Sequence, residues 1–163
     1  MARLTVLPRE TWTDAATDRI APIIDTAVSL RGAAVIALTG GHTISPVYQR
    51  LATRQLPWRA IHVFFGDERP VPPHHPESNF GMAAAALLSR VSIPACQIHR
   101  IVGEKPAIDA ARDYERELRA GVVEAASLIR AARDAPATRR VAEQRTHGEP
   151  RRPVRHARCR YRD

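Results

Sequence analysis

Residues Ile61 to Asn79 read IHVFFGDERPVPPHHPESN, and this stretch decides the fold class. Its first five residues are apolar, and the run stops at Gly66, where Asp67, Glu68 and Arg69 follow at once. Short apolar runs that end in a turn are typical of strands buried in a parallel sheet. Ligands of such sheets lie outside the carboxyl ends of the strands. We therefore predict a ligand site after Gly66; the alternative is that Asp67 and Arg69 only pair with each other in a solvated turn.

A second apolar run, AAVIAL at residues 33–38, leads into the turn TGGHT at residues 39–43. The dipeptide Ser45-Pro46 that follows gives the start signals of a helix, with serine as its expected N-cap. A strand, a glycine turn and a helix in this order aim backbone N–H groups and the helix dipole at an anion. Because the two glycines have no Cβ, a phosphate can approach their backbone closely. The turn is a candidate phosphate site, although a Gly-Gly turn can also be a plain connection.

The rest of the pattern alternates helices with strands. Further strands are expected at residues 4–7 and 98–101, and further helices from Thr13 to a stop at Gly32, at 80–88 and at 106–118. The last helix is expected to present one apolar stripe, made of Ile108, Ala111, Tyr114 and Leu118. Strands that alternate with helices predict an α/β protein with a doubly wound, Rossmann-like parallel sheet.

The chain changes character near residue 121. Residues 1–120 hold 14 Lys and Arg against 12 Asp and Glu, a net charge of +2, and residues 121–163 hold 11 against 5, a net charge of +6. Residues 121–133 can extend as a helix, whereas the residues from 135 onward have too little apolar surface to offset the entropy of ordering. We expect a domain over 1–120 and a partly helical or disordered tail over 121–163. Nucleic-acid binding by this tail is not expected, because it lacks interleaved aromatic side chains.

Composition bounds the class of protein. A hydrophobic content of 44% excludes a chain that is disordered throughout. The two cysteines, Cys96 and Cys159, have no ligand-like spacing, which indicates a reducing compartment. No apolar run reaches membrane-spanning length, and the N-terminal residues lack the apolar core of a signal peptide. We expect a soluble cytoplasmic protein whose oligomeric state the sequence leaves open.

Several histidines and carboxylates invite a chemical role that their context does not favour. His74 and His75 are expected to face solvent, since adjacent side chains in a loop rarely converge on one metal ion. His62, inside a strand, is expected to be partly buried and hydrogen-bonded. Neighbours on extended backbone point to opposite sides, so Asp67 and Glu68 are not expected to share one substrate. No metal site is predicted.

The TGGHT turn, the GDER-VPP-HPESN block and the later DYERELRA helix resemble 6-phosphogluconolactonases, which share a superfamily with glucosamine-6-phosphate deaminases. The resemblance covers about residues 4–120. It implies hydrolysis of 6-phospho-D-glucono-1,5-lactone to 6-phosphogluconate in the oxidative pentose phosphate pathway, without metal or organic cofactor. The partner it implies is a small-molecule sugar phosphate. The implied substrate-binding residues are Gly40, Gly41, His42, Thr43, Asp67 and Arg69, with Ser78 and Asn79 holding the loop in shape.

The chain also departs from the family pattern. The family turn is of the Gly-Gly-Ser-Thr-Pro type, and here His42 stands at the serine position and Ile44 at the proline position. In the family, a later strand and a Gly-x-Asp-Gly-His-Thr motif supply the histidine expected to act as general base. No residue of this chain matches that histidine, because His147 and His156 do not follow a strand. The catalytic residue is therefore unassigned, and a truncated chain is expected.

We hypothesise that residues 121–163 are a shifted-frame translation of a GC-rich gene that once encoded the missing half. Resequencing the locus tests this, since a confirmed frame without lactonase-like text in either alternative frame would exclude it. Two other functions stay open. An amino-sugar-6-phosphate isomerase or deaminase on the same scaffold would use Asp67 as the proton-abstracting base and release ammonia. A non-catalytic truncated product with a basic tail would do neither reaction.

Overall fold

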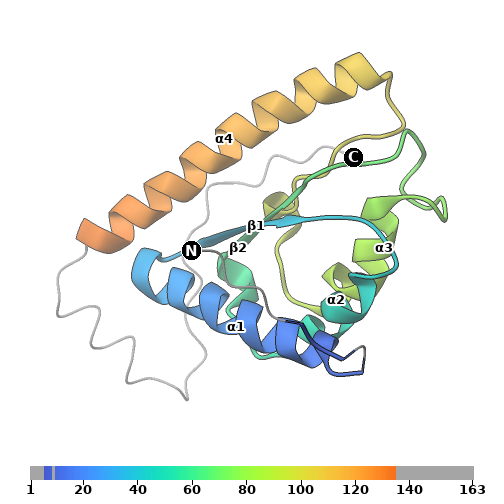
Figure 1. Ribbon diagram of the computed structural model, residues 1–163. Helices are drawn as coiled ribbons and strands as arrows, with labels where there is room; N and C mark the ends of the chain where they lie inside the picture. Colours follow the sequence, from blue (N-terminus) through green and yellow to red (C-terminus); the bar gives the residue numbers. More distant parts are fainter. Residues whose placement is uncertain (1–5, 9, 135–163) are drawn as a thin grey trace.

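The computed structural model describes residues 6–8 and 10–134, with side chains up to Gly121 (Figure 1). Its helices and strands are α1 (Trp12–Arg31), β1 (Ala34–Leu38), α2 (Ser45–Ala52), β2 (Ile61–Phe65), α3 (Asn79–Ala86) and α4 (Ala107–Asp134). Short 3-10 turns lie at Trp58–Ala60, Leu88–Arg90 and Ala95–Gln97. The two buried strands and the helix between them were predicted, and the α/β fold class is confirmed.

The two strands form a parallel pair whose register aligns their carboxyl ends. Ala34 lies opposite Ile61, and Leu38 lies opposite Phe65. The backbone N–H of Gly66, just past β2, donates to the Leu38 carbonyl at 2.8 Å. The chain therefore leaves both strands at the same edge of the sheet, which is where ligands of parallel sheets bind.

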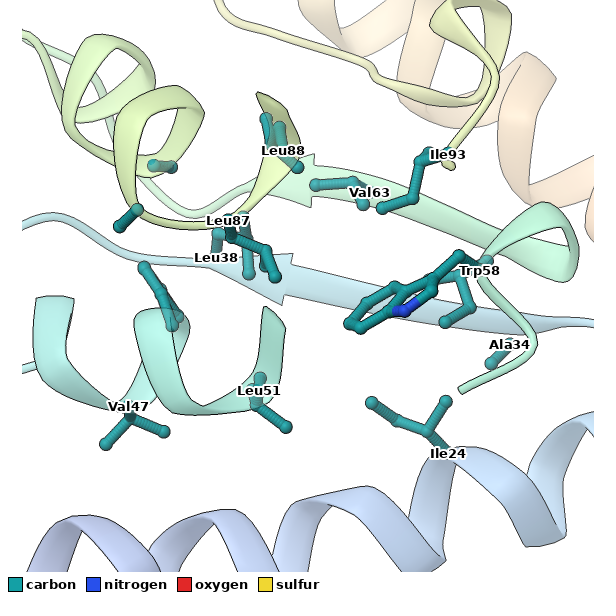
Figure 2. Close-up of a cluster of buried hydrophobic side chains, with 14 of the residues drawn as sticks. Ile24, Ala34, Leu38, Val47, Leu51, Trp58, Val63, Leu87, Leu88 and Ile93 are labelled. Carbon is teal, nitrogen blue, oxygen red and sulfur yellow. The ribbon is translucent and has the colours of Figure 1, made fainter. Parts of the chain in front are cut away.

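One face of the sheet forms the main core against α1, α2 and α3. Figure 2 shows Ile24 of α1, Leu51 of α2 and Leu87, just after α3, converging near Trp58. Val63 of β2 is fully buried in this cluster. Burial of a large apolar side chain stabilises a fold by roughly 1.5–3 kcal/mol. This packing holds the strand ends and the two helix starts that follow them in fixed positions.

The opposite face of the sheet is covered by α4, which lies across the strands from α1 (Figure 1). Phe64 stacks on the His99 ring with centroids 4.3 Å apart. A Cβ at Gly121 of α4 would lie 2.6 Å from Phe64 Cζ, so a larger residue there would push the helix away. Every residue of β2 is therefore buried, whereas Val35 of β1 keeps 46% of its surface exposed.

Several predicted boundaries are confirmed with small shifts. α1 begins at Trp12 and ends at Arg31, and its C-cap Gly32 has a φ of 81° and donates to the Val28 carbonyl at 2.7 Å. The helix expected at residues 80–88 is α3, which begins at Asn79 and ends at Ala86. The predicted helical extension over 121–133 is also confirmed, because α4 continues to Asp134.

The strand predicted at 98–101 was wrong, and the one predicted at 4–7 is tested only at its last two residues. Val6 and Leu7 lie outside any strand, and residues 4 and 5 fall outside the described residues. At 98–101 only Ile98 forms a bridge, to Val63, and the His99 N–H adds one bond to the Val63 carbonyl. The chain then turns away, because Gly103 packs against the backbone of the loop that follows β2.

The predicted apolar stripe of α4 was wrong except for Tyr114, since Ala111 is also exposed. Ile108 is 67% exposed and Leu118 is 40% exposed. The helix is rotated so that Ala110, Tyr114 and Gly121 face the sheet, because Gly121 allows a close approach and Tyr114 bonds to β2. The boundary between residues 120 and 121 stays a prediction; α4 runs across it, and the disorder expected from residue 135 lies outside the described residues.

Candidate functional site

The connection from β1 to α2, residues 39–44, is here called the glycine turn. Gly41 has a φ of 105°, a backbone conformation that favours glycine, and the Ile44 N–H donates to its carbonyl at 3.3 Å. Gly41, His42 and Thr43 are exposed. Ser45 was expected to be the N-cap of α2, but it is the first residue of the helix. The N-cap is Ile44, which offers no side-chain acceptor. Among the described residues no side chain caps the start of α2; its Pro46 has no N–H, and the Val47 and Tyr48 N–H groups donate to the Ile44 carbonyl at 3.0 and 3.2 Å.

The connection from β2 to α3, residues 66–78, is here called the charged loop, and its Glu68 carboxylate caps α3. Oε1 accepts the N–H groups of Asn79 and Arg69, both at 2.7 Å. Oε2 accepts the Phe80 N–H at 2.8 Å and the Ser78 hydroxyl at 3.3 Å. Ser78 Oγ in turn accepts from the Gly81 N–H at 3.0 Å. The first turn of α3 thus already contains an anion of the chain's own.

Asn79 joins the two connections. Its side-chain Nδ2 donates to the Asp67 carbonyl at 3.2 Å, and the residue is only 5% exposed. On its other side, a Cβ at Gly40 would overlap the Asn79 amide, so Gly40 lets the glycine turn lie directly against it. Gly40 and Asp67 are therefore brought to the same edge of the sheet, as the sequence predicted.

A tyrosine hydroxyl holds the end of each strand. Tyr48 of α2 accepts the Thr39 N–H at 2.8 Å and donates to the Thr39 carbonyl at 2.9 Å. Tyr114 of α4 accepts the Phe65 N–H at 2.8 Å and donates to the Phe65 carbonyl at 2.7 Å. Burial raises the pKa of both hydroxyls above the ordinary tyrosine value, and the backbone hydrogen bonds partly offset this. Both tyrosines therefore stay protonated and keep both bonds at neutral pH.

Asp67 and Arg69 project from the charged loop into solvent. Both residues are exposed, and no ion pair in the described part of the chain joins them, which disfavours the alternative of a solvated pair. The Arg69 backbone is fixed on both sides: its N–H binds Glu68 and its carbonyl accepts the Val71 N–H at 2.7 Å. A fixed backbone under an exposed guanidinium suits recognition of an anionic ligand.

Sequence reasoning missed the roles of Glu68, Tyr48 and Tyr114. Glu68 stands eleven residues before Asn79, so no local capping pattern announces it. Tyr114 was predicted only as part of an apolar helix face, yet the hydroxyls of both tyrosines reach the backbone at the strand ends. For Ser78 and Asn79, the expectation that they hold the loop in shape agrees with their hydrogen bonds.

A second polar cluster lies at the other end of β2. His62 Nδ1 and His99 Nε2 are 3.3 Å apart, and His99 Nδ1 lies 3.2 Å from Glu117 Oε1. His62 was expected to be partly buried and hydrogen-bonded; it is hydrogen-bonded and almost completely buried. This cluster connects α4 to the sheet and lies away from the glycine turn, since His62 stands near the start of β2.

No metal centre is indicated within residues 6–8 and 10–134, where no group of three or more His, Cys, Asp or Glu could hold an ion. His74 and His75 are exposed, and His75 Nδ1 accepts the Glu77 N–H at 3.2 Å. Along the same described part of the chain, no helix combines the length and the hydropathy needed to cross a bilayer.

The fold and the joined strand ends define an α/β protein with a candidate ligand site at the carboxyl edge of a parallel sheet. The family model of glucosamine-6-phosphate isomerases and 6-phosphogluconolactonases matches residues 8–143. The chain therefore belongs to this family.

Named relatives point to one branch of the family. A 6-phosphogluconolactonase of Nostoc sp. is 47% identical over 116 residues, which cover 69% of this chain and 48% of the relative. The crystal structure of the Thermotoga maritima 6-phosphogluconolactonase superposes with a TM-score of 0.68 at 33% identity, over 71% of this chain and 53% of that one. The Trypanosoma brucei enzyme superposes with a TM-score of 0.61 at 29% identity, over 72% and 49%. The chain spans about half the length of the relatives it matches.

Proposed function

We propose that this chain recognises 6-phospho-D-glucono-1,5-lactone and that its reaction is the hydrolysis of this ester to 6-phosphogluconate. The names of its relatives support this substrate class. The observation that supports the proposal is the contact of Asn79 with both connections, because it brings Gly40 of the glycine turn next to Asp67 of the charged loop. A soluble, cytoplasmic enzyme of the oxidative pentose phosphate pathway is the setting that this reaction implies.

The phosphate is assigned to the glycine turn. Gly41 carries no Cβ and has nothing within 4 Å of where one would lie, so an anion can reach the backbone there. The dipole of α2 favours negative charge at its start. Arg69 adds a planar fork of donors that fits phosphate oxygens.

The sugar and lactone groups are assigned to the charged loop. The Asp67 carboxylate can orient a sugar hydroxyl, because the residue is exposed and its backbone is held by Asn79. Hydrolysis requires water to attack the lactone carbonyl while a base takes its proton, and such a base contributes roughly 10²–10⁴-fold to the rate. No described residue is assigned to the lactone carbonyl as this base, and His42, an exposed imidazole in the glycine turn, is the first residue to test.

Binding should be tested with 6-phosphogluconate, the stable product, by calorimetry on the full chain. Arg69→Ala should weaken binding by about tenfold or more, since hydrogen bonds to charged groups contribute roughly 1.5–3 kcal/mol. Arg69→Lys should recover only part of this, because lysine keeps the charge and loses the fork. Arg59→Ala, which removes an exposed arginine before the start of β2, is the matched control and should bind normally.

Turnover should be tested as lactone hydrolysis above the spontaneous rate, with ammonia release from glucosamine 6-phosphate measured in parallel. Acceleration that His42→Gln abolishes would identify the base. Ammonia release without lactone hydrolysis would replace the proposal by the isomerase branch of the family. A chain that neither binds 6-phosphogluconate nor accelerates hydrolysis would overturn it.

A further inference from the structure

We propose that Glu68 is a positioning residue: its carboxylate serves as a built-in anion at the start of α3, which orients Arg69 and Asp67 and directs the ligand's phosphate to the glycine turn. This inference rests on the proposed function for the identity of the ligand. It concerns a residue that contacts backbone groups and no reacting atom.

The hydrogen bonds of Glu68 exhaust what a carboxylate can accept. A carboxylate offers about four lone-pair positions, and here four donors take them: the N–H groups of Arg69, Asn79 and Phe80 and the hydroxyl of Ser78. A carboxylate used in this way is not available for proton transfer. Its adjacency to Asp67 is therefore not a pair of carboxylates for acid and base chemistry.

The same bonds determine where Arg69 and Asp67 lie. Glu68 Oε1 holds the Arg69 N–H and the Asn79 N–H at the same distance, 2.7 Å. Asn79 then holds the Asp67 carbonyl through Nδ2. Both side chains assigned to the ligand thus belong to backbone segments that are joined through one carboxylate.

The electrostatic consequence is that the starts of α2 and α3 differ in their attraction for an anion. The dipole of each helix favours a negative group at its start. At α3 that position is filled by Glu68, and at α2 no described side chain fills it. A phosphate that approaches this edge of the sheet is therefore repelled by α3 and accepted by the glycine turn.

The test uses the full chain, with backbone NMR signals of Gly41 and Phe80 as reporters of the two helix starts. Wild-type protein titrated with inorganic phosphate should respond at Gly41 and stay unchanged at Phe80. In Glu68→Ala, phosphate should also perturb Phe80, and the affinity for 6-phosphogluconate should fall by about tenfold. Added formate should restore both the Phe80 signal and the affinity, because it replaces the missing carboxylate.

Two further variants keep the test decisive. Glu68→Gln retains the volume of the side chain but places an N–H₂ group against backbone donors, so it should lose affinity and gain nothing from formate. Glu77→Gln removes an equal charge from the same loop and should behave as wild type, since no described hydrogen bond uses the Glu77 carboxylate. If Glu68→Ala does not fold, the affinities of Glu68→Gln and Glu77→Gln for 6-phosphogluconate are compared instead, and equal affinities would overturn the proposal.

The proposal is overturned if Glu68→Ala or Glu68→Gln binds 6-phosphogluconate as wild type does, or if formate restores neither the Phe80 signal nor the affinity in Glu68→Ala. A wild-type chain that fails to bind 6-phosphogluconate would instead overturn the proposed function. In that case the response of the Phe80 NMR signal to phosphate and to formate in Glu68→Ala would still test the role of Glu68. The two failures are therefore distinguishable.

Discussion

The glycine turn and the charged loop both lead from a parallel strand into a helix of eight residues, α2 or α3. The charged loop is the longer of the two, and it folds back so that Glu68 reaches the helix that follows it. The glycine turn is short, has a residue with φ of 105° and sends no side chain to its helix. One connection caps its helix with its own carboxylate, and the other has no capping side chain, which is where we propose that the phosphate binds.

This difference teaches how a pair of similar units can produce one site and not two. Both units have the strand, the turn and the helix that favour an anion. In the proposed function, the phosphate binds to the unit that has no internal carboxylate. The closed unit contributes rigidity, because its loop holds the backbone of the residues assigned to the ligand.

The largest effect is expected where the two connections touch. Gly40→Ala should destabilise the fold by about 2–3 kcal/mol, because its Cβ displaces the buried Asn79 amide and breaks the bond to Asp67. Gly41→Ala should cost less, roughly 1–2 kcal/mol, because only backbone strain opposes it. Urea unfolding of both variants measures the difference.

A double-mutant cycle checks the cause of that difference. Asn79→Ala removes the amide that collides with the new Cβ, so the cost of Gly40→Ala should shrink by more than about 1 kcal/mol in this background. The cost of Gly41→Ala should not change. Additive costs for Gly40→Ala and Asn79→Ala would mean that the two connections do not meet as described.

An intermediate effect is expected from the tyrosine hydroxyls. Tyr48→Phe and Tyr114→Phe should each destabilise the fold by about 1–3 kcal/mol, because a backbone N–H and a carbonyl lose their partner. Hydrogen exchange should separate the two variants: Tyr48→Phe should speed exchange in the glycine turn, and Tyr114→Phe should speed it after β2. Equal acceleration of both connections by one variant would show that the two strand ends loosen together.

The smallest effect is expected at high pH. The pKa of Tyr48 and of Tyr114 is raised in the folded chain, so their contribution is complete below the unfolded value of about 10. Above that pH the unfolded chain releases protons that the folded chain retains, and stability falls as pH rises through the folded pKa. Urea midpoints between pH 9 and 11 should decline less steeply in the Tyr48→Phe, Tyr114→Phe double variant. Identical slopes would rule out these hydroxyls as the cause.

The strands, most helices and the location of the site could be predicted from the sequence because they depend on local patterns. The apolar run 61–65 and the turn at Gly66 lie together in the chain, and the parallel register then brings the two strand ends together. The specific resemblance of the charged loop supplied Asp67 and Arg69 as candidates, whose ligand contacts stay predictions.

The remainder depends on contacts between distant residues. The rotation of α4 follows from the close approach of Gly121 to Phe64, and helical periodicity alone cannot reveal such an approach. The bridge at Ile98 ends after one residue because the later chain packs against the charged loop. The bonds from Glu68 to Asn79 and Phe80 likewise require the loop to fold back.

The two tyrosines also set an order in time. The hydroxyl of Tyr48 closes a loop of nine residues to Thr39, whereas that of Tyr114 closes one of 49 residues to Phe65. The longer closure costs about 1.5 kcal/mol more in chain entropy. During synthesis Tyr48 also emerges long before Tyr114. The glycine turn can therefore mature while the chain is still growing, and the end of β2 becomes fixed only when α4 arrives.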